Sequence, residues 1–356
     1  MGCSGCGTAQ LDTAIDKSSL FTDYFYQTPK SQLLQRHYDF LIDHLLRKSY
    51  ITPSSKVLEI GSNNGLFLEA LSPHIAKCIG VEPVGYVAQK AIGRGIESLI
   101  DFFNPVSASK LIESHGTFDL IVARHCMAHN ADLRPIVEGM EILLSDNGAV
   151  IIENPYWPTL VDKVLFDQIY HEHIYYHSVS SIEKLFEPSA LNLHEVLNTD
   201  SQGGSKLYIL GKSDVTSERG DILCQIKEQE HSLKDMHFYS SFQEKIIDKI
   251  GMLREQLDQV LDRGGVVHGY GASAKSFTLF AMLNITAKQI PYLVDNTDNK
   301  LGTFLPDSEI QVIDEITSLK NAPDCYLITV WNYAKEIKEK INSVSSKPIE
   351  LIIPHE

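Results

Sequence analysis

The sequence has 356 residues, of which 43% are hydrophobic, with 31 Lys and Arg against 46 Asp and Glu. The formal charge of −15 repels polyphosphate backbones and anionic membranes, which argues against nucleic acid and membrane partners. No run of about 18 apolar residues is present, and the N-terminus lacks the basic and apolar regions of a signal peptide, so we expect a soluble cytoplasmic protein.

Residues 1–50 are expected to form a lead-in segment. Apolar positions 34, 38, 41, 42 and 45 follow helical spacing, which predicts a helix over 33–46. The segment also contains Cys3-x-x-Cys6, which has the spacing of metal ligands. Structural zinc normally needs four ligands from two such pairs, and only one pair is present. Two interpretations of this segment therefore stay open, a zinc-binding remnant and a disordered N-terminus.

Residues 51–212 are predicted to form an α/β domain, because short apolar strands alternate with amphipathic helices. This alternation favours a parallel sheet with helices on both faces. The expected strands cover 57–60, 78–81, 120–123 and 149–152, and a further strand-like run covers 206–211.

Residues 213–263 are rich in Glu, Lys and Gln and are expected to form a helical connector. The α/β alternation then resumes over 264–356, which predicts a second α/β domain. Its expected strands cover 266–270, 291–294, 325–330 and 349–353.

The first predicted strand leads into a glycine turn, Gly61-x-x-x-Gly65, whose backbone can approach a ligand without interference from Cβ atoms. Glu82 ends the next strand, where a carboxylate can accept both hydroxyls of a ribose. Asp101 and Phe102 follow at the next strand end, where they could meet the amine and the ring of adenine. These residues predict a nucleotide site, against the alternative that the glycines only permit a tight turn.

Tyr170-His171-Glu172-His173 is a cluster of titratable side chains in the later part of the first predicted domain. In a helix or tight turn, residues 170 and 173 lie on one side, so a phenol and an imidazole could face one substrate. Histidine is well suited to remove a proton near neutral pH, and proton removal beside a carbonyl creates the nucleophile that carbon methylation requires. The alternative is a structural pair of histidines, whose spacing is not that of a zincin motif.

A second glycine turn, Gly269-x-Gly271-x-x-Ala274, follows a predicted strand, and Asp295 ends the strand after it. This pattern satisfies the dinucleotide fingerprint, so an NAD(P)-dependent oxidoreductase is one alternative function. A non-catalytic nucleotide-binding protein is another, and it would have no need of the cluster at 170–173.

Together these segments resemble the nucleotide-sugar C-methyltransferases, enzymes that methylate C3 of a 4-keto-deoxysugar carried on a nucleoside diphosphate. The first domain resembles the class I S-adenosylmethionine-dependent methyltransferases. The resemblance covers nearly the whole chain, in the segments 3–11, 21–26, 59–65, 167–173, 203–205, 269–275, 295–302 and 331–332. It implies a class I methyltransferase domain, a second Rossmann-like domain and a remnant of an N-terminal zinc module.

The resemblance implies S-adenosylmethionine as cofactor and His173 as the general base that forms an enolate. The other implied catalytic residues are Tyr24, Tyr170, Glu172 and His125. The implied cofactor-binding residues are Glu59, Gly61, Ser62, Asn63, Asn64, Gly65, Glu82, Pro83, Asp101 and Phe102. The implied substrate-binding residues are His129 and Tyr26 and, at the second turn, Gly269, Tyr270, Gly271 and Lys275, where the diphosphate or nucleoside would bind.

This sequence departs from the usual family pattern in three places. The family's zinc module has two Cys-x-x-Cys pairs, and one is found here. His125 stands where asparagine is common, and Gln202 stands where histidine is usual. The carrier nucleotide, the sugar configuration, the methylated face and the oligomeric state stay open.

Overall fold

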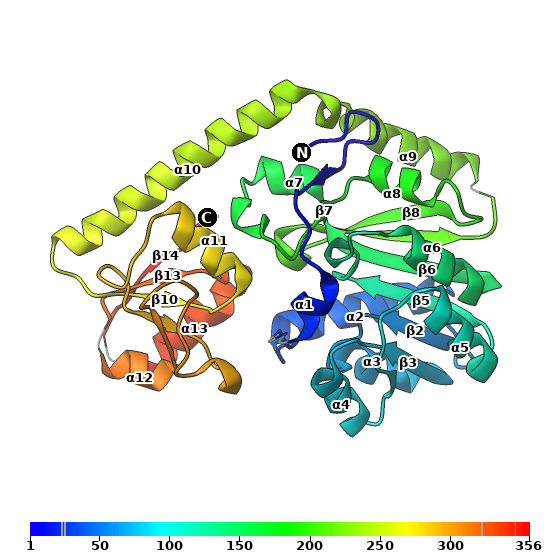
Figure 1. Ribbon diagram of the computed structural model, residues 1–356, viewed down its shortest axis with the longest axis horizontal. Coiled ribbons are helices and arrows are strands. Elements are labelled where there is room, and N and C mark those ends of the chain that lie inside the picture. The colour runs from blue at the N-terminus through cyan, green and yellow to red at the C-terminus, as the bar shows by residue number, and fades with distance from the viewer. Residues whose placement is uncertain (23, 25, 215, 322, 346) are drawn as a thin grey trace. The chain divides into compact units, whose positions relative to one another are not determined.

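The computed structural model describes residues 1–356 except 23, 25, 215, 322 and 346. The chain forms two compact units, each with its own sheet (Figure 1). The first unit comprises 1–159 and 171–236, and the second comprises 160–170 and 237–356.

The first unit is built on a seven-stranded sheet of order β4-β3-β2-β5-β6-β9-β8. Its strands are β2 (Lys56–Ile60), β3 (Lys77–Val81), β4 (Glu97–Leu99), β5 (Phe118–Arg124), β6 (Leu144–Pro155), β8 (Asn192–Thr199) and β9 (Ser205–Gly211). The strands from β4 to β6 run parallel, whereas β9 is antiparallel to both β6 and β8. All carboxyl ends of the parallel strands therefore meet at one edge.

Helices cover both faces of this sheet, because side chains alternate between the faces along each strand. Leu58 and Ile121 pack in one core, while their neighbours Val57 and Leu120 pack in the other. One core receives α5 (Pro105–His115), α6 (Arg134–Leu143) and α8 (Val179–Phe186), and the other receives α2 (Gln32–Arg47) and α3 (Leu66–Leu71). The remaining helices of this part of the chain are α1 (Lys17–Thr22), α4 (Gly85–Gly93), α7 (Trp157–Asp162) and α9 (Ser217–Gln229).

The N-terminal segment lies against the middle of the sequence. Strand β1 (Ala9–Gln10) pairs antiparallel with β7 (Tyr175–Tyr176), so that Ala9 is opposite Tyr176. The backbone N–H of Leu11 also donates to the carbonyl oxygen of Ile174 over 2.9 Å. The start of the chain thus supports the segment that directly follows His173.

The second unit contains a five-stranded parallel sheet of order β12-β11-β10-β13-β14. Its strands are β10 (Val267–Tyr270), β11 (Tyr292–Val294), β12 (Gln311–Ile313), β13 (Cys325–Ile328) and β14 (Glu350–Ile352). The helices are α10 (Met236–Asp262), which begins one residue before this unit, α11 (Ala274–Met282), α12 (Glu315–Lys320) and α13 (Ala334–Val344). Two cores lie on this sheet, one including α10 and α11 and the other α13.

The sequence predictions of fold class are confirmed for both α/β sheets, and each expected strand and the helix over 33–46 overlaps an observed element. Strands β8 and β12 were not predicted from the sequence. A strand end was expected before Asp101 without bounds, and β4 is found there; β4 and β12 have only three residues each, too few for periodicity to define. Within the described residues, no helix combines the length and the apolarity needed to cross a bilayer.

A buried carboxylate holds the start of α8. Glu230 is 3% exposed, and its two oxygens accept hydrogen bonds from the backbone N–H groups of Val179 and Ser180 at 2.7 and 2.8 Å. The hydroxyls of Ser180 and Tyr156 donate to the same carboxylate at 2.7 and 2.8 Å. A remote side chain therefore satisfies donors that a helix N-terminus leaves without intrahelical partners.

We expect Glu230→Ala to lower the free energy of unfolding by about 2–4 kcal/mol, because several charge-assisted hydrogen bonds are lost in a buried place. Denaturant unfolding measures the change. The exposed neighbour Glu228 supplies the control variant Glu228→Ala, which should stay within about 0.5 kcal/mol of wild type. A loss no larger than that of the control would contradict the capping role of Glu230.

Candidate active site

The first glycine turn lies at the carboxyl edge of the first sheet, between β2 and α3. Gly61 has φ 67°, and a Cβ atom there would lie 2.8 Å from Cβ of Cys126. Gly65 has φ 77° and directly precedes α3. Ser62 and Asn64 are buried in the turn. The close backbone and the following helix are the features expected of a cradle for a nucleotide ligand.

Glu82 at the end of β3 is tied to this turn. Its carboxylate accepts from the backbone N–H of Asn63 and from that of Val84, both at 2.9 Å. The residue is 5% exposed, and burial raises the pKa of Glu82 while the two N–H donors oppose that rise. Pro83, between them, is half-buried. The carboxylate thus holds the turn from the strand end at which the sequence predicted a ribose contact.

The lead-in segment crosses the same turn. The backbone N–H of Thr28 donates to Oδ1 of Asn63 over 2.9 Å, and Nδ2 of Asn64 donates to the carbonyl oxygen of Thr28 over 2.9 Å. Nδ2 of Asn63 also donates to the carbonyl oxygen of Tyr26 over 3.4 Å. Asn63 and Asn64 therefore use their side chains to hold the lead-in segment over the glycine turn.

Asp101 and Phe102 follow β4, at the same edge of the sheet. Asp101 is 3.1 Å from Nζ of Lys110 and accepts from the backbone N–H of Phe102 over 2.8 Å. The ring of Phe102 lies 5.7 Å from that of Phe21, and Nζ of Lys17 is 4.7 Å from its centroid. The predicted adenine-binding pair is therefore approached by residues of the lead-in segment.

Glu59 contacts a neighbouring strand instead of the glycine turn. It is 1% exposed, and its Oε1 accepts from Nε and Nη2 of Arg124 at 3.1 and 2.7 Å. Burial raises the pKa of Glu59, and the guanidinium of Arg124 opposes that rise. This ion pair joins β2 to β5 where both strands end.

His173 lies beside His129 and Glu172. The rings of His173 and His129 are 5.0 Å apart and meet edge to face at 82°. Oε2 of Glu172 is 3.8 Å from Nδ1 of His129. Burial lowers the pKa of His129 to about 4, and the charge of His125 adds to that effect, so His129 is neutral at neutral pH. Three of the predicted site residues are thus brought together.

Aromatic residues of the lead-in segment complete this group. The ring of Phe21 lies 6.3 Å from His129 and 5.0 Å from Tyr24. Burial raises the pKa of Glu172, whereas His171 and a hydrogen bond from Tyr24 oppose the rise. Tyr26 is 47% exposed and its ring is 6.3 Å from Tyr24. Tyr170 is half-buried and is the last residue of the first segment of the second unit; the first unit resumes at His171.

A second group of charged side chains was not predicted from the sequence. Glu153, at the end of β6, is fully buried, and its carboxylate lies 2.9 Å from Nε2 of His37 and 3.7 Å from Nε2 of His125. Oγ1 of Thr199 donates to it over 2.9 Å. A signal was available, because Glu153 directly follows a predicted strand, as Glu82 does. His37 offered no such signal, since it is one polar position in a helix.

The two unusual positions of the sequence occupy adjacent loops. His125 and Gln202 both have φ 52°, in the left-handed region that non-glycine residues rarely adopt. Nε2 of His125 lies 2.9 Å from Oγ of Ser201, the residue before Gln202. The histidine at 125 and the glutamine at 202 therefore belong to one local arrangement.

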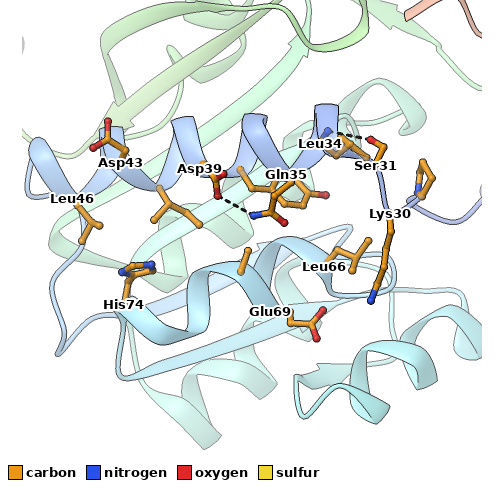
Figure 2. A pocket seen from close by; sticks show the side chains of 14 residues that line it. Lys30, Ser31, Leu34, Gln35, Asp39, Asp43, Leu46, Leu66, Glu69 and His74 are labelled. Atoms are coloured by element: carbon orange, nitrogen blue, oxygen red, sulfur yellow. Dashed lines mark hydrogen bonds between the residues drawn. The ribbon is translucent and has the colours of Figure 1, made fainter. Parts of the chain in front are cut away.

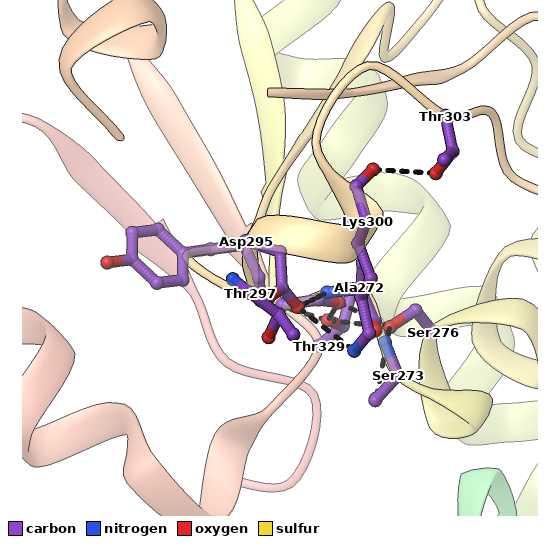
Figure 3. A network of polar contacts seen from close by, with 10 residues as sticks. Ala272, Ser273, Ser276, Asp295, Thr297, Lys300, Thr303 and Thr329 are labelled. Carbon is purple, nitrogen blue, oxygen red and sulfur yellow. Dashed lines mark hydrogen bonds and ion pairs between the residues drawn. The ribbon is translucent and has the colours of Figure 1, made fainter. Parts of the chain in front are cut away.

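In the second unit, Asp295 holds the glycine turn (Figure 3). Its Oδ2 accepts from the backbone N–H of Ala272 over 2.9 Å and lies 3.5 Å from Nζ of Lys300, while Oδ1 accepts from the N–H of Thr297 over 2.9 Å. Lys300 also donates to the carbonyl oxygen of Ala272 over 2.7 Å. Asp295 thus holds the turn that precedes it much as Glu82 does in the first unit.

The predicted residues of the second turn differ in their surroundings. Gly271 has φ 106°, and a Cβ atom there would lie 2.5 Å from Val330. Gly269 is inside β10, opposite Leu293. Tyr270 is 6% exposed, and its hydroxyl donates to Glu315 over 3.0 Å in the interior.

Lys275 is a buried cation at the start of α11. Its Nζ donates to Oδ1 of Asn332 over 2.9 Å and lies 4.9 Å from the ring centroid of Trp331. Burial lowers the pKa of Lys275 to about 8, and Asp167 opposes the shift. Asp167 in turn accepts from Nε1 of Trp331 over 2.6 Å, and its other oxygen lies 2.9 Å from Nε2 of His355.

The lining of a groove of about 520 Å³ between α2 and α3 includes none of the predicted site residues (Figure 2). Gln35, Asp39 and Glu69 are among its polar residues, and Nε2 of Gln35 donates to Asp39 over 2.9 Å. The thiols of Cys3 and Cys6 are unbridged, the first exposed and the second half-buried. Among the described residues, no three His, Cys, Asp or Glu side chains come together as a metal site.

Comparison with known proteins identifies two sequence families in the chain. Residues 33–196 match a family described as a methyltransferase domain, and residues 200–355 match the C-methyltransferase C-terminal domain. The C-methyltransferase NovU of Streptomyces niveus is 28% identical over 354 residues, which cover 99% of this chain and 84% of that protein. The uncharacterized methyltransferase YcgJ of Bacillus subtilis (strain 168) is 27% identical over 152 residues, 40% of this chain and 58% of that protein.

A solved structure of magnesium protoporphyrin IX methyltransferase (ChlM) from Synechocystis PCC 6803 with bound SAH is similar with a TM-score of 0.44. It is 14% identical, and the match covers 56% of this chain and 100% of that chain. The sequence matches carry the identification, since the two families together extend from residue 33 to residue 355. The protein is an S-adenosylmethionine-dependent C-methyltransferase.

Proposed function

We propose that the protein methylates C3 of a nucleoside-diphosphate-linked 4-keto-deoxysugar, with His173 as the general base. The observation that carries this proposal is the grouping of His173 with neutral His129 and with Glu172, which hydrogen-bonds Tyr24. The substrate class follows from the resemblance to nucleotide-sugar C-methyltransferases. The match to the C-methyltransferase C-terminal domain supports carbon as the acceptor atom.

The 4-keto group acidifies the proton on C3, and His173 removes that proton to leave an enolate. The donors that the resemblance implies for the oxyanion of the enolate are Tyr24, His125 or Tyr170. His129, being neutral, can donate to or accept from a sugar hydroxyl. When bound, S-adenosylmethionine supplies a methyl group activated by its sulfonium. The residues of the protein position the methyl donor and the sugar relative to each other and exclude water from between them.

The first glycine turn fits the methyl donor. A Cβ atom at position 61 would meet Cys126, so only glycine lets the turn pack this closely against the residues that follow β5. Glu82 would accept the ribose hydroxyls, while Asp101 and Phe102 would receive the adenine. Gly61 to Gly65 would surround the remainder of the molecule, including its charged amino-acid end.

In the second unit, we assign the diphosphate or nucleoside end of the sugar substrate to the turn at 269–275. Lys275 is a cation of this turn, and its low pKa of about 8 reflects a buried ammonium that a phosphate group would stabilise. Gly271 has no side chain, so the diphosphate or nucleoside could approach the backbone of the turn there. Tyr270 lies in the interior, where its hydroxyl donates to Glu315, and we assign it the role of supporting the turn.

Replacing the base tests the central assignment. We expect His173→Asn to lower turnover by about two to four orders of magnitude while leaving methyl-donor affinity within about twofold, as for loss of a general base. Methyl-labelled S-adenosylmethionine, a panel of 4-keto nucleotide sugars and mass analysis of the products provide the assay. His171→Asn is the matched control, because the side chain of His171 is 51% exposed. Turnover of His173→Asn close to that of the control would remove His173 from the role of base.

Removing the carboxylate at position 82 tests the methyl-donor site. Glu82→Ala should raise the Kd for S-adenosylmethionine at least about tenfold, because both the ribose contact and the support of Asn63 are lost. Titration calorimetry measures the affinity, and the affinity for the nucleotide sugar should stay unchanged. Glu113→Ala, on the exposed side of α5, is the control. Equal affinities in both variants would place the ribose elsewhere.

Neutralising the buried lysine tests the second turn. Lys275→Met should weaken binding of the nucleotide sugar about tenfold or more, since a charge-assisted contact to phosphate is removed. Lys288→Met changes an exposed lysine of the same unit and should bind normally. Fluorescence or calorimetric titration with a nucleoside diphosphate sugar gives the affinities, and a parallel titration with NAD(P) is expected to show no binding. Unchanged sugar-nucleotide affinity in Lys275→Met would argue against this assignment.

A further inference from the structure

Five charged or ionisable side chains meet where β2, β5 and β6 end. They are Glu59, Arg124, Glu153, His37 and His125. Glu59 and Arg124 neutralise each other, because Arg124 donates two hydrogen bonds to Glu59. The guanidinium of Arg124 also lies 4.2 Å from the ring centroid of Phe67. The negative charge of Glu153 therefore needs compensation chiefly from the two histidines.

Glu153 is ionised despite complete burial. Burial alone would raise its pKa, but the charge of His125, the hydrogen bond and charge of His37, and Arg124 together lower the pKa of Glu153 to about 2. Oε1 accepts from Oγ1 of Thr199 at 2.9 Å, and Oε2 faces both imidazoles, His37 at 2.9 Å and His125 at 3.7 Å. A buried carboxylate is tolerated when it is paired and hydrogen-bonded in this way.

His125 is held in one orientation by several contacts. Its backbone N–H donates to the carbonyl oxygen of Glu153 over 2.7 Å, and its Nε2 is 2.9 Å from Oγ of Ser201. The backbone has φ 52°, a conformation that costs about 1 kcal/mol or more and persists only where the surroundings impose it. The side chain is 25% exposed, so it reaches the surface of the carboxyl edge while Glu153 stays behind it.

We propose that Glu153 is a positioning residue that keeps His125 as an imidazolium at the carboxyl edge of the sheet. Among the described residues, Oε2 of Glu153 lies 3.7 Å from Nε2 of His125. His37 of α2 contacts the same carboxylate, Arg124 next to His125 is paired with Glu59, and His129 follows four residues further along the chain. On the proposed function, which this inference deepens, the positive charge serves the oxyanion that forms when the proton leaves C3.

Histidine NMR on the wild-type protein tests the charge directly and needs no sugar substrate. We expect the ring nitrogens of His125 to show the imidazolium pattern at pH 7.5, with the resonances identified by their loss in His125→Asn. A neutral-imidazole pattern at that pH would overturn the proposal. Because this measurement involves no turnover, failure of the sugar assay leaves its outcome intact, and the two results are separable.

Glu153→Gln tests the source of the charge, since it keeps a hydrogen-bond acceptor for Thr199 and removes the anion. The protonation midpoint of His125 should fall by about one pH unit or more, as the loss of an opposite charge at 3.7 Å implies. Glu195→Gln is the matched control, because Glu195 faces His44 of the same helix α2 at 3.9 Å. The His125 midpoint should not move in this control. An equal midpoint in wild type and Glu153→Gln would show that Glu153 does not hold the charge.

Discussion

Both units depend on the same kind of interaction. In each, a glycine turn follows one strand, β2 or β10, and a carboxylate at the end of the neighbouring strand, β3 or β11, accepts a hydrogen bond from the backbone of that turn. In the first unit, Glu82 accepts from the backbone N–H of Asn63, and in the second, Asp295 accepts from that of Ala272, both at 2.9 Å. A turn with left-handed glycines has few contacts of its own, so an anion behind it fixes its shape before a ligand arrives. The two turns differ in that Lys300 covers Asp295.

The carboxyl edge of the first sheet is also a place of concentrated buried charge. Isolated ions in such a place would be very costly, and the chain meets this cost by pairing Glu59 with Arg124 and Glu153 with His37 and His125. The pairs bind α2, β2, β5 and β6 together at the edge where the methyl donor and the acceptor are proposed to meet. Rigid placement of charge before the reaction is the general means by which enzymes stabilise developing oxyanions.

Much of the fold could be predicted from residues close together in sequence. The alternation of apolar strands and amphipathic helices identified both sheets, and Gly61, Gly65 and Gly271 marked the turns at their edges. The bounds of the short strand β4 could not be predicted, because three residues show no periodicity. The antiparallel strand β8 was not predicted, because its residues do not alternate regularly between buried and exposed. The grouping of His129 with His173 followed the resemblance, not any spacing, since 44 positions separate them in the sequence.

The amino-acid sequence by itself determined the two α/β units, the glycine turns and the residues able to do acid–base chemistry, because these depend on local periodicity and on residue type. Only the tertiary structure decided which charges face one another: His37 reaches Glu153 across 116 positions, and Thr28 closes over Asn63 across 35. It also decided that Glu59 contacts Arg124 and that Tyr270 points to Glu315 in the interior. Such contacts arise from how strands order themselves in a sheet, and no local pattern encodes that order.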